Sequence, residues 1–348
     1  MNTRKTHLDI LRVVACLFVI ATHFGFGYSV YQSKTAGSMP YWISLAISIS
    51  CHFAVPMYFM ISGALLLGKE ESLTVLYKKR VSRIVITLLI ASGIYYVVEK
   101  YVLNQPFPIG QIYSGEAYYH LWYLYAYIAY LAFLPFLRII AKKMTKPLFD
   151  YMFFTYIAII GIIPIFELLF FNNATHLNQH LQITPFAMRI FIMPLVGYYL
   201  ENKFDINKVS EKRLLLLWLA DISLILLSAY ATKVYAVPYA QTYLGCFAPV
   251  HAITLFITVK VQAQKNSKTQ KSLSSFSTKI APYTLGIYIL HMIPMQILTS
   301  NLQLRDMYSQ LSFLPQLLVW IIVVVILFFL SYVFTKILHK IPFFAKYL

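Results

Sequence analysis

The chain has 348 residues, of which 59% are hydrophobic and only 12% are charged, and its mean hydropathy is +0.67. A soluble globular domain does not carry so apolar a composition. Stretches of roughly 20 apolar residues recur along the chain, each long enough to cross a hydrocarbon core of about 30 Å as a helix. These stretches are continuous rather than alternating, which excludes a transmembrane β-barrel. The sequence therefore predicts an all-α polytopic membrane protein.

The apolar stretches predict about ten transmembrane helices in a single integral membrane domain over residues 1–348. The helices are expected at residues 8–30, 42–67, 83–103, 119–140, 150–171, 184–200, 213–231, 241–260, 280–299 and 314–338. Residues 261–279, rich in Lys, Ser and Gln, are expected to be a polar cytoplasmic linker between the eighth and ninth helices. Because the number of helices is even, both termini are expected on one side of the membrane.

The formal net charge of +17 is distributed unevenly among the connections. All but six of the 29 Lys and Arg residues lie at the N-terminus, in four alternate connections or in the C-terminal tail; the exceptions are Arg12, Lys34, Lys100, Arg189, Lys233 and Arg305. The positive-inside rule then places both termini in the cytoplasm, where anionic lipid is the expected neighbour of the basic connections. This distribution favours membrane topology over nucleic-acid binding as the reason for the charge.

The first predicted helix contains three titratable residues, Asp9, Arg12 and His23. Such residues cost free energy in hydrocarbon and usually mark a site or an ion path. Eleven residues at about 100° each bring His23 to within roughly 20° of the face that carries Arg12, and the helical rise separates them by about 16 Å. Asp9 is three residues from Arg12 and can contact it. The alternative is that Arg12 reaches the lipid headgroups and His23 is a packed, hydrogen-bonded core residue.

Two arginines, Arg80 and Arg83, stand one turn apart at the cytoplasmic start of the third predicted helix. Two planar guanidinium groups at this spacing can bind phosphate oxygens more specifically than lysines do. The alternative is a positive-inside anchor, an interpretation that suits the neighbouring Lys78 and Lys79 better than Arg83.

At the outer side, Glu116, His120 and Trp122 stand at the start of the fourth predicted helix. A carboxylate, an imidazole and an indole at one rim can bind a hydroxylated acceptor. The alternative is that Trp122 belongs to the aromatic belt of the membrane and that Glu116 is only solvated.

His291 falls eleven residues into the ninth predicted helix, about 16 Å along it and near the bilayer midplane. A histidine at this depth either stays neutral and hydrogen-bonded or takes part in proton transfer. His52 and His251 are weaker candidates. The polar residues are thus expected at three depths, with the arginines near the cytoplasm, His291 and then His23 further out, and His120 with Glu116 at the outer rim.

Five segments resemble, in order, those of the membrane acyltransferase 3 family. They are "LDILRVVACLFVIATHF" with its R-x10-H pattern, "VPMYFMISGALL", "LYKKRVSRI", "YHLWYLYAYI" and "TLGIYILH", which lie between residues 8 and 291. The chain is most similar to the compact members, which lack an appended soluble domain. The resemblance implies transfer of an acyl group, usually acetyl, from acyl-CoA on the cytoplasmic side to a hydroxyl of a cell-envelope carbohydrate or lipid-linked glycan, in the inner membrane of a bacterium.

The resemblance also implies roles for individual residues. His23 is expected to be essential, Arg12, Arg80 and Arg83 to bind the CoA phosphates, and His120 and His291 to take part in catalysis. From the residues themselves, Glu116 and Trp122 are expected to position the acceptor, and Asp9, three residues from Arg12, is expected to orient it. Acetyl-CoA is expected as a co-substrate, with no permanently bound cofactor and no metal.

The chemistry leaves two routes open for His23. It can remove the proton from the acceptor hydroxyl, or it can carry the acyl group itself. Two other classes of protein remain as alternatives: a transporter or flippase for a lipid-linked sugar or small solute, and a sensor or assembly subunit whose titratable residues are only structural. Against the transporter, no inverted repeat and no pair of broken helices is evident. The acyl group, the glycan, the side of transfer and the oligomeric state stay open.

Overall fold

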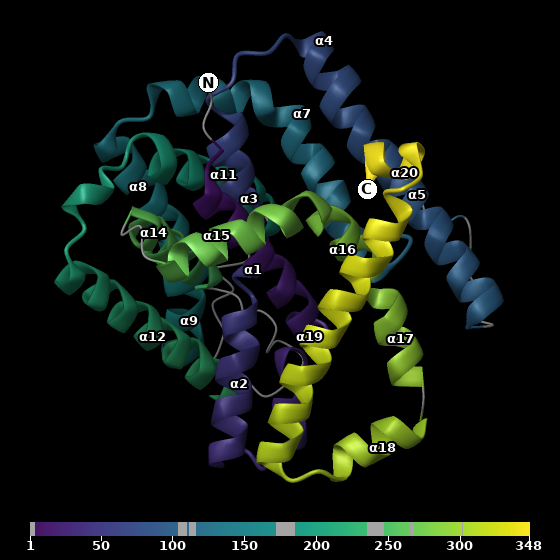
Figure 1. Cartoon of the computed structure of the whole chain (residues 1–348). Helices are drawn as coiled ribbons and strands as arrows, with labels where there is room; N and C mark the ends of the chain where they lie inside the picture. The colour runs from purple at the N-terminus through teal and green to yellow at the C-terminus, as the bar shows by residue number, and fades with distance from the viewer. Residues whose placement is uncertain are drawn as a thin grey trace. The chain divides into compact units, whose positions relative to one another are not determined.

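The computed structural model describes residues 4–103, 110, 116–171, 185–234, 247–264, 268–300 and 302–348. Every regular element within these ranges is a helix (Figure 1). The chain divides into two compact units, each assembled from two separate segments. Unit 1 consists of Met1–Gly68 and Ile140–Ala281, and unit 2 of Lys69–Ile139 and Pro282–Leu348.

Six helical segments in the described ranges are long and apolar enough to cross a membrane, which confirms an all-α polytopic membrane protein. These segments are Met39–Leu66, Leu73–Val102, Tyr119–Lys143, Lys146–Phe171, Glu211–Val234 and Phe313–Leu338. A seventh would be the pair Lys271–Leu290 and Met292–Ser300, which is bent by 43°. The helices at the other three predicted spans are shorter, α1 (Thr6–Thr22), α11 (Pro185–Asn202) and α14 (Ala248–Gln264). The count of ten and the cytoplasmic position of the termini stay predictions.

The first helix of unit 1 is shorter than its apolar pattern suggests. α1 ends at Thr22, whereas a helix to residue 30 was expected. His23 follows as its C-cap, and the chain then forms the 3-10 turn η1 (Gly25–Gly27). Gly25 adopts a φ of +53°, and a Cβ on Gly27 would lie 1.8 Å from the carbonyl oxygen of Ala21. The apolar stretch of the sequence therefore extends beyond the end of the helix, because the two glycines turn the backbone after Thr22.

The second predicted span consists of two helices, α2 (Met39–Cys51) and α3 (Ala54–Leu66), with His52 and Phe53 between them. Ser38 caps α2 by accepting a hydrogen bond from the backbone N–H of Tyr41 at 3.3 Å. Pro56 lacks the N–H that would bond to the carbonyl of His52 four residues earlier, which explains why the helix is interrupted here. The break places His52 and Phe53 at the junction of two helices.

α3 and α11 cross with their backbones in close approach (Figure 1). A Cβ on Gly63 would lie 1.9 Å from the carbonyl oxygen of Pro194, and a Cβ on Gly197 would lie 2.0 Å from that of Met60. Small residues at such crossings let membrane helices pack through their backbones. The two glycines thus let α3 and α11 pack backbone against backbone.

Gly63→Ala is expected to destabilise the protein by about 1 to 3 kcal/mol or more, because the added methyl group must push two backbones apart. The matched control is Gly93→Ala on α5 (Ser82–Val97), where a Cβ would meet nothing within 4 Å. The thermal unfolding of both variants in detergent micelles measures the difference. Equal unfolding temperatures for the two variants would contradict the close crossing.

The expected linker is largely helical. α14 continues to Gln264, and α15 (Lys268–Ile280) follows in the same unit. Arg4 donates to the backbone carbonyl of Thr278 at 2.9 Å, which attaches α15 to the start of α1. The polar residues of this segment therefore cover the N-terminal end of α1 instead of forming an unstructured connection.

In unit 2, the chain enters through the short α4 (Leu73–Val75) and the π-helical segment η3 (Leu76–Val81), followed by α5 and a second π-helical segment, η4 (Val98–Val102). The remaining helices are η5 (Tyr119–Leu121), α7 (Trp122–Lys143), α16 (Thr284–Leu290), α17 (Met292–Ser300), α18 (Leu302–Gln310), α19 (Phe313–Leu338) and α20 (Pro342–Tyr347). π-helical segments often accompany functional residues. Here η3 carries Arg80, one of the predicted site residues.

Candidate active site

The N-terminal end of α1 carries a group of charged side chains around Asp9. Arg4 donates from Nε to Asp9 Oδ2 at 2.6 Å, and Arg12 Nη1 lies 3.9 Å from Asp9 Oδ1. Asp9 is buried, whereas the side chain of Arg12 is 28% exposed. The closer partner of Asp9 is thus Arg4, which the sequence interpretation did not include. Among the residues that the structure describes, the guanidinium of Arg12 has this long ion pair with Asp9 alone, which leaves donors for a second anion.

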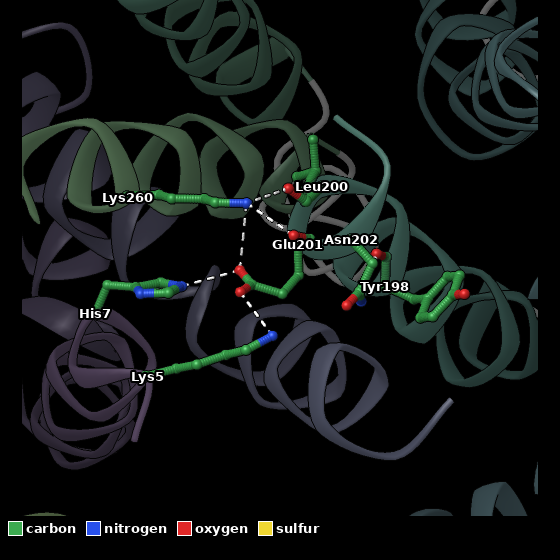
Figure 2. Close-up of polar contacts among 7 residues, drawn as sticks. All are labelled: Lys5, His7, Tyr198, Leu200, Glu201, Asn202 and Lys260. Carbon is green, nitrogen blue, oxygen red and sulfur yellow. Dashed lines mark hydrogen bonds and ion pairs between the residues drawn. The ribbon is translucent and has the colours of Figure 1, made fainter. Parts of the chain in front are cut away.

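A second charged group at the same end centres on Glu201 (Figure 2). Lys5 Nζ lies 2.9 Å from Glu201 Oε1, and His7 Nε2 and Lys260 Nζ lie 2.9 Å and 3.4 Å from Oε2. Lys260 also donates to the carbonyl oxygens of Leu200 and Glu201 at 2.7 and 3.0 Å. The carboxylate is buried, with a side-chain exposure of 5%. It therefore joins the ends of α1, α11 and α14.

At the opposite end of α1, His23 lies beside the break between α2 and α3. Thr22 donates from Oγ1 to the carbonyls of Phe18 at 2.7 Å and of Cys51 at 3.2 Å. His52, the residue after Cys51, is close enough to His23 for the two imidazoles to interact electrostatically. His52 itself is fixed by a 2.7 Å hydrogen bond between Nδ1 and the carbonyl of Ser48. Arg12 and His23 thus lie at different ends of one helix, and each belongs to its own polar group.

Arg80 in unit 2 is paired with a carboxylate. It donates from Nε to Glu71 Oε2 at 2.9 Å and from Nη2 to Oε1, while Arg138 donates to Oε2 at 2.8 Å. The hydrogen bond from Arg80, together with that from Arg138, holds the pKa of Glu71 at about 2. Arg83, on the first turn of α5, is exposed. Of the two predicted phosphate ligands in unit 2, Arg83 is therefore accessible, whereas Arg80 already donates two hydrogen bonds to Glu71.

Glu71→Gln is expected to lower the unfolding temperature at neutral pH, because two neighbouring guanidiniums lose their shared carboxylate. The folded-state pKa lies below the ordinary value of 4.5, so the contribution is complete above 4.5 and is lost as the pH falls toward about 2. The difference in unfolding temperature between wild type and variant should therefore be constant from about pH 8 to about pH 5 and shrink below. A difference that grows on acidification would contradict the pairing.

His120 and His291 come together in unit 2, with ring centroids 5.1 Å apart. His120 Nε2 lies 3.2 Å from the carbonyl oxygen of Ile289, and His291 Nδ1 lies 2.6 Å from that of Tyr288. The hydroxyl of Tyr288 donates to the carbonyl of His120. His291 occupies the bend between α16 and α17. The two histidines, which are far apart in the sequence, are thus neighbours, because η5 packs beside the bend.

The rim group is not as expected. His120 is buried, with 1% exposure, whereas Glu116 is exposed and Trp122 is half-buried. Trp122 contacts Tyr123, with ring centroids 6.2 Å apart. Glu116 and Trp122 can therefore meet an acceptor from outside, while His120 belongs to the packed interior of unit 2.

The sequence interpretation missed Arg4 and Glu71, which pair with the predicted residues Asp9 and Arg80, and Arg138, which shares Glu71 with Arg80. It also missed the separate charged group of His7, Glu201 and Lys260. Each of these residues lies outside the predicted spans or at the end of one, where charged residues are explained by the orientation of the chain in the membrane. The one usable signal was a carboxylate immediately next to a span, as for Glu201 after residues 184–200. No pattern in the sequence shows which distant cation it meets.

The sequence profile of the acyltransferase 3 family, described as an acyltransferase domain, matches residues 6–336. The chain belongs to this family and is a multi-pass membrane acyltransferase. No curated protein and no solved structure matches it.

Proposed function

We propose that this acyltransferase moves an acetyl group from acetyl-CoA on the cytoplasmic side to a hydroxyl of a cell-envelope carbohydrate, in the inner membrane of a bacterium. The observation that carries the proposal is α1 itself. It presents Arg12 within a basic cluster at one end and His23, next to a helix break, at the other. A donor with a polyphosphate head and a reactive thioester at its far end suits such a helix.

Arg12 is the proposed phosphate ligand in unit 1, and Arg80 and Arg83 are the proposed phosphate ligands in unit 2. Guanidinium groups form paired, charge-assisted hydrogen bonds with phosphate oxygens. Arg83 is exposed and can bind a phosphate at the surface. Arg80 can also bind a phosphate if its hydrogen bonds to Glu71 are replaced by hydrogen bonds to phosphate oxygens. Arg138 would then still neutralise the carboxylate of Glu71.

The acyl transfer is assigned to His23. A sugar hydroxyl is a weak nucleophile until a base takes its proton, and neutral imidazole is the usual base near neutral pH. His23 either takes this proton and returns it to the thiolate of CoA, or its ring nitrogen accepts the acyl group first. In both routes CoA leaves as the thiol and the acyl group ends on the hydroxyl oxygen.

The acceptor is assigned to the exposed side of unit 2, at Glu116 and Trp122. An indole face stacks on a sugar ring, and a carboxylate accepts hydrogen bonds from hydroxyl groups. His120 and His291 lie ring to ring, and each is hydrogen-bonded to a backbone carbonyl oxygen, that of Ile289 and that of Tyr288. Their proposed part in catalysis is to hold η5 beside the α16–α17 bend and to take up or release a proton there.

The test uses the purified protein in lipid vesicles with radiolabelled acetyl-CoA and hydroxylated acceptors, among them lipid-linked glycans and free polysaccharide. The expected result is label on the acceptor, dependent on the protein. Movement of unmodified acceptor across the vesicle membrane without label would instead favour the transporter or flippase.

A further inference from the structure

Unit 1 contains a hydrogen-bonded pair of a histidine and an aspartate that the proposed function does not use. His251 on α14 hydrogen-bonds through Nδ1 to Oδ2 of Asp221 on α12 (Glu211–Val234), at 2.6 Å. Asp221 is fully buried, in a helix long enough to cross the membrane. Its second oxygen, Oδ1, has no hydrogen-bond partner among the described residues. A carboxylate kept at this depth is costly and normally has a functional reason.

The imidazole is held in one orientation. Phe53 and Trp218 pack edge-on to it, with ring centroids at 5.2 Å and 6.1 Å, and Trp218 is fixed by a 3.1 Å hydrogen bond from Nε1 to Thr258 Oγ1. The side chain of His251 keeps 12% exposure. With Nδ1 on the carboxylate, Nε2 is the edge left to accept a proton, and within the described part of the chain nothing bonds it. A buried carboxylate that holds an imidazole in one orientation allows that imidazole to act as a general base.

The pair lies next to the helix break that His23 adjoins. Phe53, which contacts His251, also packs on Phe18 of α1 at 5.1 Å between ring centroids. Thr22 bonds the carbonyl of Cys51, two residues before Phe53. Both imidazoles therefore border residues 51–53. Of the two, His251 is the imidazole that a buried carboxylate, Asp221, holds by a hydrogen bond.

We propose that His251, positioned by Asp221, moves the acceptor's proton while His23 carries the acyl group. The proposal rests on the proposed function and adopts the second of its two routes, in which a ring nitrogen of His23 accepts the acyl group first. First, a ring nitrogen of His23 attacks the thioester carbon; the C–N bond forms, the C–S bond breaks, and CoA leaves as the thiol with the proton released by the acyl-imidazolium. The acceptor hydroxyl oxygen then attacks the acyl carbon while Nε2 of His251 takes its proton. The C–N bond breaks, and His251 returns the proton to the departing nitrogen of His23.

The experiment compares the wild-type chain with His251→Gln, Asp221→Asn and Thr232→Val in lipid vesicles, using acetyl-CoA labelled in the acetyl group. Gln can still donate to Asp221 but cannot take up a proton. Thr232→Val is the matched control, because Thr232 is buried on α12 and donates within that helix to the carbonyl of Ser228. Folding is checked by thermal unfolding, and CoA release and protein-bound label are measured together.

His251→Gln is expected to release about one CoA per protein, to keep the label on the protein and to turn over about 100-fold or more slowly. A second change, His23→Ala, should abolish that label. Asp221→Asn should slow turnover about 10- to 1000-fold, and Thr232→Val should leave it within about threefold. A merely structural role would not leave acyl-enzyme behind.

Three results would overturn the proposal: turnover by His251→Gln within about threefold of wild type, a folded His251→Gln protein that takes up no label, or unfolding of both pair variants while the control stays folded. Failure of the proposed function is distinguishable, since wild type itself would then release no CoA.

Discussion

His23→Ala is expected to lower acetyl transfer by about 10²- to 10⁴-fold or more while the Kd for CoA stays within about threefold. The reason is position: His23 caps the end of α1 away from the charged groups at Asp9 and Glu201, so its loss removes the reacting imidazole and leaves the phosphate ligands intact. Steady-state release of CoA thiol gives the rate, and equilibrium binding of labelled CoA gives the affinity.

Cys16→Ala is the control for packing, because Cys16 is fully buried on the same helix between Arg12 and His23. It should keep most of the activity. If His23→Ala kept wild-type turnover, or if it lost CoA binding to the same extent as turnover, His23 would not be the acyl-transfer residue. Tolerance at His23 would then favour the sensor or assembly subunit.

Arg83→Ala is expected to weaken CoA binding by about 10- to 100-fold, the cost of losing one or two charge-assisted hydrogen bonds to phosphate. Arg83→Lys should recover only part of this, because a single ammonium cannot pair with two phosphate oxygens at once. The binding of labelled CoA to protein in vesicles, at low and high salt, measures both variants.

Lys78→Ala and Lys79→Ala are the matched controls, since these exposed lysines precede Arg80 on the same π-helical segment. They should change the Kd by no more than about threefold. If the lysine variants and Arg83→Ala weakened CoA binding equally, the region would attract anions by its net charge alone. That result would contradict a specific phosphate site at Arg83.

The sequence is sufficient to predict the class of fold and most of the long helices, because continuous apolar stretches and the positive-inside distribution are strong signals in a membrane protein. It predicts helix ends less well. α1 stops at Thr22 although apolar residues continue, since Gly25 and Gly27 turn the chain. Residues 268–280 form a helix although their composition is that of a linker, because they pack on the start of α1.

The side chains that interact across helices were the least predictable. Asp9 near Arg12 is a local contact that helical spacing gives directly. Glu201 with Lys5 and Lys260, and Asp221 with His251, join residues far apart in the chain, so their pairing depends on which helices pack together. The meeting of His120 and His291 has the same origin, since it depends on the bend after α16.

Release of CoA from acetyl-CoA by the purified wild-type protein in lipid vesicles, with a hydroxylated acceptor present, is the most direct test that the donor is an acyl-CoA. The structure and the family predict sustained release of CoA thiol, with the acetyl group recovered on the acceptor. A folded protein that neither binds CoA nor releases it from acetyl-CoA or any other acyl-CoA tested would contradict the account.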